Sequence, residues 1–435
     1  AGEVMAAGAV SLPLGGWLPP LGIALRADGL SVAMLAMTAA VGLLVSIGAL
    51  DALRDARQRQ YFWPLWLLLL TGMNGVYLST DIFNLYVMIE VIALAAVGLT
   101  VLSGTREAVR AGLEYMYASI LGALLFLMGV GFVYLQLGRL DFAGLAGAEP
   151  SGALIAAIAL MFVGLALKTA LFPLHFWLPA AHANASAPAS ALLSGLVVKA
   201  ALYIVLRLAQ HMPFPSETFL ALGGVMGAGA VIWGSIQALR AKRLKLLVAW
   251  STVAQIGLIF VAFARAGEQG LSESWTAAAL LILAHGVAKA AMFLAAGRIK
   301  DEIGHDVICD LDRAPIRPTL AQFTFALAAI SLIGLPPSLG FIGKWALMEG
   351  AMAAGYWHWV GVTMAGTLMS VAYFSRVFAG FLRFDRVRAP VGEHQGWALA
   401  DAAPLILAFG ALGLGLLAAP LLSFLEIGYV YGGAR

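Results

Sequence analysis

The sequence predicts an all-α polytopic membrane protein. Its 435 residues are 62% hydrophobic and only 11% charged, whereas soluble domains carry about 25% charged residues. Apolar segments of the roughly 20 residues that a spanning helix needs follow one another along the whole chain. The basic residues fall mostly into alternate connections between these segments. A soluble enzyme with a buried core is therefore excluded.

Twelve of these apolar segments are expected to be transmembrane helices, and no soluble domain interrupts them. Their boundaries are good to a few residues. In order along the chain they lie at 28–50, 61–79, 82–102, 113–137, 153–178, 188–208, 218–238, 246–264, 275–297, 319–349, 357–381 and 401–425.

The distribution of basic residues supports this count of twelve. When the connections are assigned alternately to two sides, one side receives 16 lysines and arginines and the other receives 5. Basic residues collect on the cytoplasmic side of membrane proteins. If one helix were miscounted, every later connection would change sides and the two groups would be mixed. We therefore expect a multi-pass protein of the bacterial plasma membrane with four basic connections in the cytoplasm: 51–60, 239–245, 298–318 and 382–400.

Four lysines lie inside apolar segments: Lys168, Lys199, Lys289 and Lys344. Each costs roughly 2.5–3.5 kcal/mol at the centre of a spanning helix, so we expect all four to face the protein interior. Burial disfavours the charged form of a lysine, and a nearby carboxylate favours it. The lysines and Glu90 can therefore form a proton relay. The alternative is a purely structural ion pair between Glu90 and Lys168, although one acid cannot neutralise four bases.

A histidine accompanies one of these lysines. His285 precedes Lys289 by four residues, which puts both on one face of a helix. Imidazole changes its charge near neutral pH, so His285 is a candidate member of the relay. The alternative is a packed, hydrogen-bonded core histidine.

Two lysine-bearing segments contain helix breakers, Pro173 in LALKTALFPLHFWLPAAH and Pro336-Pro337 in SLIGLPPSLGFIGKWALM. Proline removes a helix hydrogen bond, and in hydrocarbon a broken helix is tolerated where it lines a wet cavity. A simple kink is the alternative. Paired breaks point to inverted repeats around an ion site. We expect an N-terminal segment with the first full helix at 1–60 and a first five-helix repeat at 61–210. A second, inverted five-helix repeat is expected at 217–385, and a C-terminal helix at 401–435.

No metal and no redox cofactor is predicted for the chain itself. The single cysteine, Cys309, allows no internal disulfide and no multi-cysteine metal or iron–sulfur site. The sequence has no glycine-rich dinucleotide fingerprint and no phosphate loop. Nothing in it indicates a nucleic-acid partner.

Several of these stretches resemble the antiporter-like membrane subunits shared by Mrp multisubunit cation/proton antiporters, respiratory complex I and energy-converting membrane hydrogenases. They are DIFNLYVMIEV with Glu90, LALKTALFPLHFWLPAAH with Lys168, SGLVVKAALYIVLR with Lys199, AHGVAKAAMF with His285 and Lys289, and GLPPSLGFIGKWALM with Lys344. FNLY and FIGK look most like the D-type subunits of the Mrp antiporters. RLKLLVAWSTVAQIGLI is similar to a further recurrent stretch. The secondary polar candidates are His175, His182, Ser251 and Gln255.

This resemblance implies a proton-translocating subunit that works with other membrane subunits of a larger complex, as a monovalent cation (Na⁺)/proton antiporter. Protons would enter near Glu90 and Lys168, and then pass Lys199, the pair His285 and Lys289, and Lys344. One alternative is a proton-pumping subunit of a quinone oxidoreductase or hydrogenase, and a second is a non-conducting scaffold. Family members usually have fourteen helices, so about two N-terminal spans are expected to be missing here.

Overall fold

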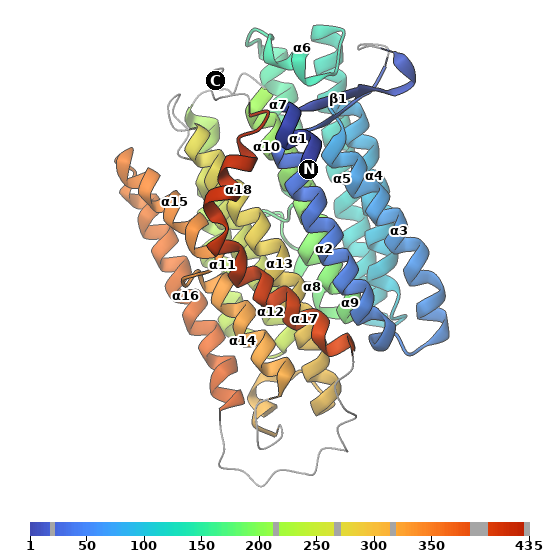
Figure 1. The fold of residues 1–435 in the computed structure, drawn as a ribbon, viewed down its shortest axis with the longest axis vertical. Coiled ribbons are helices and arrows are strands. Elements are labelled where there is room, and N and C mark those ends of the chain that lie inside the picture. Colours follow the sequence, from blue (N-terminus) through green and yellow to red (C-terminus); the bar gives the residue numbers. More distant parts are fainter. Residues whose placement is uncertain (18–21, 212–216, 265–270, 314–318, 383–398, 430–435) are drawn as a thin grey trace.

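The computed structural model describes the chain except for residues 18–21, 212–216, 265–270, 314–318, 383–398 and 430–435. It is a bundle of helices that run roughly along one long axis (Figure 1). The longer helices are α2 (Gly29–Ala52), α3 (Ala56–Leu78), α4 (Ile82–Val101), α5 (Arg106–Leu137), α7 (Gly152–Lys168), α10 (Val198–His211), α11 (Glu217–Arg240), α12 (Leu244–Phe263), α13 (Leu271–Ile303), α14 (Leu320–Ile333), α15 (Leu339–Ala353), α16 (Trp357–Phe381) and α17 (Leu399–Leu416).

Short elements connect these helices. They are α1 (Gly2–Ala7), α6 (Phe142–Ala146), α8 (Leu178–Asn184), α9 (Ala187–Leu192), α18 (Ala418–Leu425), a π-helical turn (Leu193–Val197) and two 3₁₀ turns (Leu14–Gly16 and Ile308–Arg313). Strands β1 (Val10–Pro13) and β2 (Ala24–Ala27) form an antiparallel hairpin with Val10 opposite Ala27. The predicted all-helical membrane fold is confirmed apart from this hairpin, which the apolar pattern does not predict.

Several long helices begin at a short polar residue that satisfies a free backbone N–H of the first turn. Asp28, Asp81, Thr105, Ser151 and Ser338 precede α2, α4, α5, α7 and α15, and each side chain accepts a hydrogen bond from the N–H three residues later. Such caps stabilise a helix start by about 1 kcal/mol each. They explain why these helices begin where the apolar runs begin.

Eight helices of the described residues are long and apolar enough to cross a membrane, or nine if the bent pair at 401–416 and 418–425 is one span. The eight are α2, α4, α5, the continuous helix at 187–211, α11, α12, α13 and α16. Helices α7 and α14 are apolar but have only 17 and 14 residues. A multi-pass membrane protein is thus confirmed, whereas the count of twelve spans stays a prediction.

The centre of the bundle is built from three of these spans. The most apolar stretches of 187–211, 244–263 and 274–303 are 94%, 89% and 100% buried, against 33–50% for the other five spans. A helix that is apolar on all sides and buried on all sides belongs in the core rather than against lipid. The central lysines Lys199 and Lys289 lie on two of these core helices.

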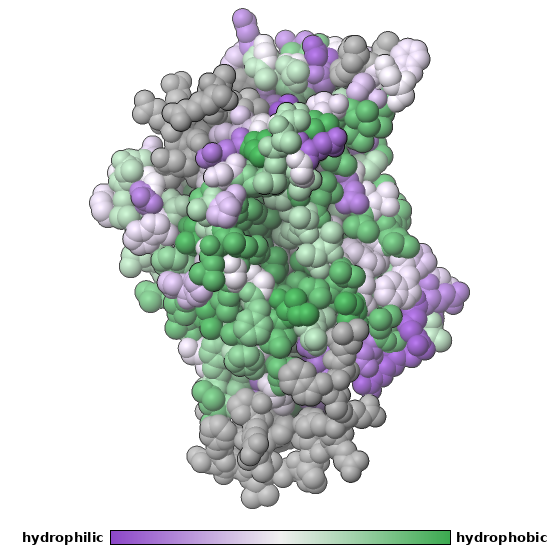
Figure 2. All heavy atoms as spheres, in the orientation of Figure 1, coloured by the Kyte–Doolittle hydropathy of each residue, from purple (hydrophilic) through white to green (hydrophobic). Residues whose placement is uncertain are grey.

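The two ends of the bundle carry different connections. At the lower end of Figure 1, which we call the basic end, Arg298 of α13 bonds both Asp51 and Asp401, and Arg243 pairs with Asp306 at 3.1 Å. The upper end, which we call the hairpin end, carries β1 and α6. A broad hydrophobic band separates hydrophilic patches near the two ends on the face that Figure 2 shows. This is the pattern of a protein that spans a bilayer.

The predicted basic loops need one correction. Lys245 was expected in the loop 239–245, but it lies in the first turn of α12, is only 5% exposed, and donates a hydrogen bond to the carbonyl of Ala185. Helix α12 begins at Leu244, two residues before the predicted 246, and Leu244 is buried. Parts of the other loops, 314–318 and 383–398, lie outside the described residues.

Candidate functional site

Glu90 and Lys168 form an ion pair between neighbouring helices. Lys168 is the last residue of α7, and its Nζ lies 2.8 Å from Oε1 of Glu90 on α4 and 2.9 Å from Oγ of Ser119 on α5. The lysine side chain is 7% exposed and the glutamate side chain 29% exposed. The pair is therefore buried at its lysine and partly exposed at its glutamate.

The break after Lys168 is an unwound segment between α7 and α8. Ala170 takes a left-handed backbone conformation with φ of 55°, and the Phe172-Pro173 bond is cis. The indole of Trp177 donates to the carbonyl of Leu167 at 2.9 Å. The Leu167 carbonyl also accepts a hydrogen bond from the backbone N–H of Ala170 at 3.1 Å, so the indole adds a side-chain contact that holds the unwound segment against the end of α7.

Lys199 is fully buried and has a neutral partner. Its Nζ donates to the carbonyl of Ser194, within the π-helical turn that precedes α10. Such turns leave backbone groups available for other bonds and are frequent at functional sites. The hydroxyl of Ser194 lies 3.0 Å from that of Thr252 on α12, and Thr252 donates to the carbonyl of Val248. Lys199 is thus connected to α12.

Lys289 contacts the same part of α12. Its Nζ donates to the carbonyl of Val248 at 2.8 Å and to Oγ of Ser251 at 2.5 Å. The Val248 carbonyl therefore accepts from Thr252 and from Lys289. We refer to Lys199, Ser194, Thr252, Ser251 and Lys289, joined through this carbonyl, as the central cluster.

Lys344 lies beside the second break. Its Nζ donates to the carbonyls of Leu332 and Ile333, at 3.0 and 2.8 Å, where α14 ends. The side-chain amide of Gln255 donates to the same Leu332 carbonyl at 3.0 Å. Gly334, with φ of 83°, and the prolines that follow separate α14 from α15 and free these carbonyls. We refer to Lys344, Gln255 and the two carbonyls as the second-break cluster.

Two buried histidines lie near the central cluster. His182 and His285 are 1% and 3% exposed, and neither ring has a hydrogen-bond partner within the described parts of the chain. Both are close enough to Lys199 and Lys289 to interact electrostatically with them. His175, the remaining histidine among the predicted site residues, stacks on Phe172 in the unwound segment, with ring centroids 5.4 Å apart. It belongs to neither cluster.

The charges of the site are unevenly matched. In the part of the chain that the structure describes, Glu90 is the one carboxylate that pairs with any of the four lysines. Lys199, Lys289 and Lys344 bond carbonyl and hydroxyl oxygens instead. Those partners suit an ammonium that has shed its hydration, but they add no negative charge, so each lysine can be protonated or neutral without losing an ion pair.

The hydroxyl groups that connect the lysines were not predicted from the sequence. The Ser119 hydroxyl contacts Lys168, the Thr252 hydroxyl contacts the carbonyl that Lys289 bonds, and the Ser194 hydroxyl contacts that of Thr252. All three residues are buried. A polar residue in an apolar segment is a usable signal, but the sequence holds many serines and threonines, and only the packing of the helices selects these.

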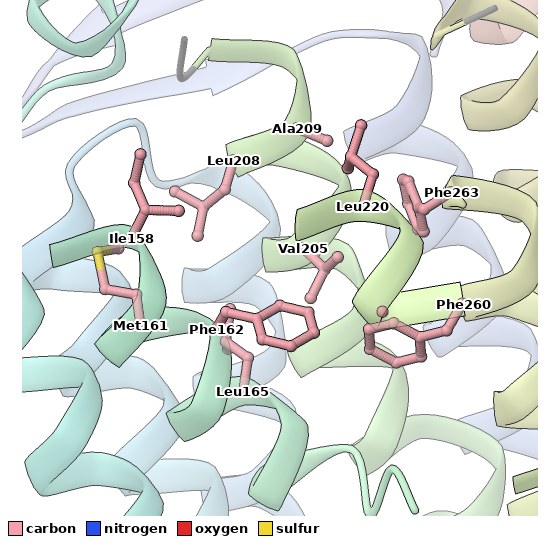
Figure 3. A pocket seen from close by; sticks show the side chains of 11 residues that line it. Ile158, Met161, Phe162, Leu165, Val205, Leu208, Ala209, Leu220, Phe260 and Phe263 are labelled. Carbon is pink, nitrogen blue, oxygen red and sulfur yellow. The ribbon is translucent and has the colours of Figure 1, made fainter. Parts of the chain in front are cut away.

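An apolar pocket between α7, α10, α11 and α12 lies apart from these groups. Phe162, Val205 and Phe260 face one another across it (Figure 3), and the rings of Phe162 and Phe260 are 6.1 Å apart. Its lining residues carry only hydrocarbon and thioether side chains. Such a lining cannot carry a proton.

Comparisons with known proteins agree with the resemblance described above. Residues 79–370 match the family described as NADH:quinone oxidoreductase/Mrp antiporter, TM. The N-type subunit of the NADH-quinone oxidoreductase of Desulforudis audaxviator is 35% identical over 395 residues, covering 86% of this chain and 78% of that protein. The D-type subunit of the Na(+)/H(+) antiporter of Alkalihalophilus pseudofirmus is 31% identical over 390 residues, with 86% and 76% coverage.

Two solved structures have the same fold. A chain of the Mrp complex from Dietzia sp. DQ12-45-1b aligns with a TM-score of 0.88 and 27% identity over 99% of this chain and 89% of that one. A chain of the membrane-bound sulfane sulfur reductase, an archaeal respiratory membrane complex, aligns with a TM-score of 0.90 and 27% identity. The alignment covers 99% of this chain and 88% of that one. Since the family match spans more than half of the sequence, the chain belongs to the NADH:quinone oxidoreductase/Mrp antiporter transmembrane family.

Proposed function

We propose that this chain is the proton-translocating subunit of a multisubunit antiporter that exchanges a monovalent cation, Na⁺, for protons. The observation that carries the proposal is the line of polar groups through the most buried helices, from the Glu90–Lys168 pair through the central cluster to the second-break cluster. Buried ionisable groups in a membrane interior are costly and mark ion pathways. The Na(+)/H(+) antiporter subunits among the relatives, and the Mrp complex among the structures, support the choice of an antiporter.

In this proposal a proton passes from Lys168 to Lys199 through a small cavity. The cavity has a volume of about 20 Å³ and is lined by Lys168, by Ser119 and, from the helix that carries Lys199, by Val197, Ala200 and Ala201. Roughly 10–15 Å³ is enough for one water molecule. One water in this cavity, hydrogen-bonded to the Ser119 hydroxyl, would take the proton from Lys168 towards the helix that carries Lys199.

The proposal gives His182 and His285 a part beside the central cluster. An imidazole can accept a proton on one nitrogen and release another from the opposite nitrogen. The two rings lie within electrostatic reach of Lys199 and Lys289. We propose that they carry the proton between these lysines, and that the two lysine-bearing breaks belong to inverted repeats at 61–210 and 217–385.

The function is tested on the intact complex reconstituted in vesicles that contain a pH-sensitive dye. We expect a Na⁺ gradient to drive proton movement without any electron donor or acceptor. If protons move only when a quinone, hydrogen or another redox substrate is turned over, the antiporter assignment is wrong and the redox-driven alternative replaces it.

A redox-driven pump is the second candidate function, because one relative is a subunit of an NADH-quinone oxidoreductase and one structural neighbour comes from a sulfane sulfur reductase. The proteins that co-purify with the chain separate the two candidates. Co-purification with small membrane subunits alone would support the antiporter. Co-purification with iron–sulfur subunits would support the redox-driven pump. A non-conducting scaffold is disfavoured, since three buried lysines without a carboxylate partner would only cost it stability.

The basic end is proposed to face the cytoplasm of a bacterial cell. Cys309, the only cysteine of the chain, is exposed near this end, and Ser11 is exposed in β1 at the hairpin end. An impermeant thiol reagent is expected to spare Cys309 in intact cells and to label it in inside-out vesicles. In a Cys309→Ser background, Ser11→Cys should give the reverse pattern. Labelling of Cys309 from outside, with Ser11→Cys protected, would invert the topology.

A further inference from the structure

Lys245 is a fifth lysine inside the bundle, and the proposed relay does not use it. It lies in the first turn of α12 at the basic end, is 5% exposed, and donates to the carbonyl of Ala185, where α8 ends. None of the ion pairs among the described residues includes it. A buried ammonium without a counter-ion is costly, so packing alone does not explain a lysine here.

The end of α8 does not require this ammonium group either. A carbonyl that is left free at a helix end needs a hydrogen-bond donor. The Ala185 carbonyl already accepts a hydrogen bond from the hydroxyl of Ser190 on α9, at 3.3 Å. A leucine or methionine in place of Lys245 would fill the same space without burying a charge. The hydrogen bond from Lys245 is therefore more than the helix end needs.

On α12, Lys245 lies one turn from the central cluster. It precedes Val248 by three residues, so the two positions share a face of the helix. The Val248 carbonyl accepts hydrogen bonds from Lys289 and Thr252, at 2.8 and 3.1 Å. On the other side of Lys245, the side chain of Arg243 is 41% exposed at the basic end. Lys245 thus lies between the exposed surface of the basic end and the central cluster.

His182 is placed between Lys245 and Lys289. Its backbone carbonyl accepts from the Ser190 hydroxyl at 2.7 Å, and the same hydroxyl donates to the carbonyl that Lys245 bonds. Its ring packs edge-on against Phe293, with centroids 5.9 Å apart, and Phe293 follows Lys289 by one turn of α13. His182 precedes the carbonyl that Lys245 bonds by three residues, about 4.5 Å along a helix axis. The flexible four-carbon stem of a lysine can cover such a distance.

The imidazole of His182 has both nitrogens available. The residue is 1% exposed, and neither nitrogen has a hydrogen-bond partner within the described parts of the chain. Buried polar atoms are usually bonded, so an unbonded imidazole beside two lysines is a costly choice for a residue that only packs. It suits a group that accepts a proton on one nitrogen and releases one from the other.

We propose that Lys245 is the residue through which the central cluster exchanges protons with water at the basic end, with His182 as the next group; this inference rests on the proposed function. In the inward step the neutral amine of Lys245 gains a proton from a hydronium ion, which becomes water. An N–H bond of the Lys245 ammonium then breaks, and one ring nitrogen of His182 gains that proton. The other ring nitrogen loses its proton to the neutral amine of Lys289, and a half-turn of the ring restores the first tautomer. Lys245 and His182 each gain and lose one proton, and Lys289 ends protonated.

The test compares Lys245→Met with Lys245→Arg in the reconstituted complex, as the rate per assembled complex. Methionine has a similar length and cannot hold a proton, whereas arginine keeps a charged donor for the Ala185 carbonyl but cannot release its proton. We expect both variants to slow Na⁺-driven proton movement by about tenfold or more, and Lys245→Arg to dissociate at the temperature of the parent complex. Lys242→Met, which removes an exposed charge three residues earlier, is the matched control and should transport normally.

The step through His182 is tested by His182→Phe, alone and together with Lys245→Met. The phenyl ring keeps the edge-on contact with Phe293 and has no nitrogen. If the two residues lie on one path, the double variant should be about as slow as the slower single variant. Losses that multiply in the double variant would contradict a path from Lys245 through His182.

The outcomes separate this inference from the proposed function. If Lys289→Met abolishes transport but Lys245→Met transports at the parent rate, the relay exists and Lys245 is not in it. If Lys245→Arg restores the rate that Lys245→Met loses, or if both fail only because the complex does not assemble, Lys245 is a structural anchor and the inference is also wrong. If Lys289→Met transports normally, the proposed function itself fails.

Discussion

Replacing Lys199 or Lys344 by methionine is expected to leave the complex assembled and to slow proton-coupled transport by tenfold or more, equal to roughly 1.4 kcal/mol of barrier. Both side chains are buried, and within the described residues both donate only to backbone carbonyls. Removal of a buried charge that has no ionic partner is often neutral or stabilising. Methionine has a similar length and cannot hold a proton, so the loss should fall on transport and not on folding.

The measurement is the transport rate per assembled complex, together with the temperature of dissociation of each variant. Lys199→Arg and Lys344→Arg should also fail, because arginine stays protonated and cannot pass the proton on. Lys300→Met at the exposed end of α13 removes a charge of the same sign outside the bundle and should transport normally. Normal rates in both buried methionine variants, or losses that are explained by poor assembly, would contradict the relay assignment.

The sequence predicted the membrane fold well because that prediction depends on local composition. Each long apolar run became a helix, and Pro173 and Pro336-Pro337 mark the two breaks that the structure has next to Lys168 and Lys344. Proline acts on its own backbone and on the preceding turn, so its effect can be read without knowing the neighbours. The segment expected at 319–349 is accordingly divided into α14 and α15, and the segment expected at 153–178 is helical only as far as Lys168.

The contacts inside the site could not be predicted in the same way. The position of Lys168 in an apolar segment shows that it needs a partner, and Glu90 was a natural candidate because it is acidic and also lies within an apolar segment. That Ser119 completes the site depends on how α5 packs against α7. The π-helical turn at Leu193–Val197 has no proline that announces it.

Replacing Glu90 by glutamine is expected to slow transport by tenfold or more, again roughly 1.4 kcal/mol of barrier. The substitution keeps the shape of the side chain and removes the negative charge with which Lys168 pairs. Among the described residues, Lys168 then keeps the Ser119 hydroxyl as its one hydrogen-bond partner. Breaking a fully buried ion pair costs about 3–5 kcal/mol, and the cost here should be smaller because the Glu90 side chain is 29% exposed. Assembly must therefore be measured together with transport in every variant.

The double variant Glu90→Gln/Lys168→Met separates a relay from a structural pair, because it removes both charges and leaves no unpaired ion. If the pair only holds α4 against α7, the double variant should recover both assembly and transport. If the pair handles protons, the double variant should assemble as well as the parent complex and still fail to transport, which is the result we expect. Glu114→Gln is the matched control, because Glu114 pairs with Arg110 on the outer surface of α5, where an exposed ion pair contributes little. Transport by the double variant at the parent rate would leave the Glu90–Lys168 pair with a structural role only.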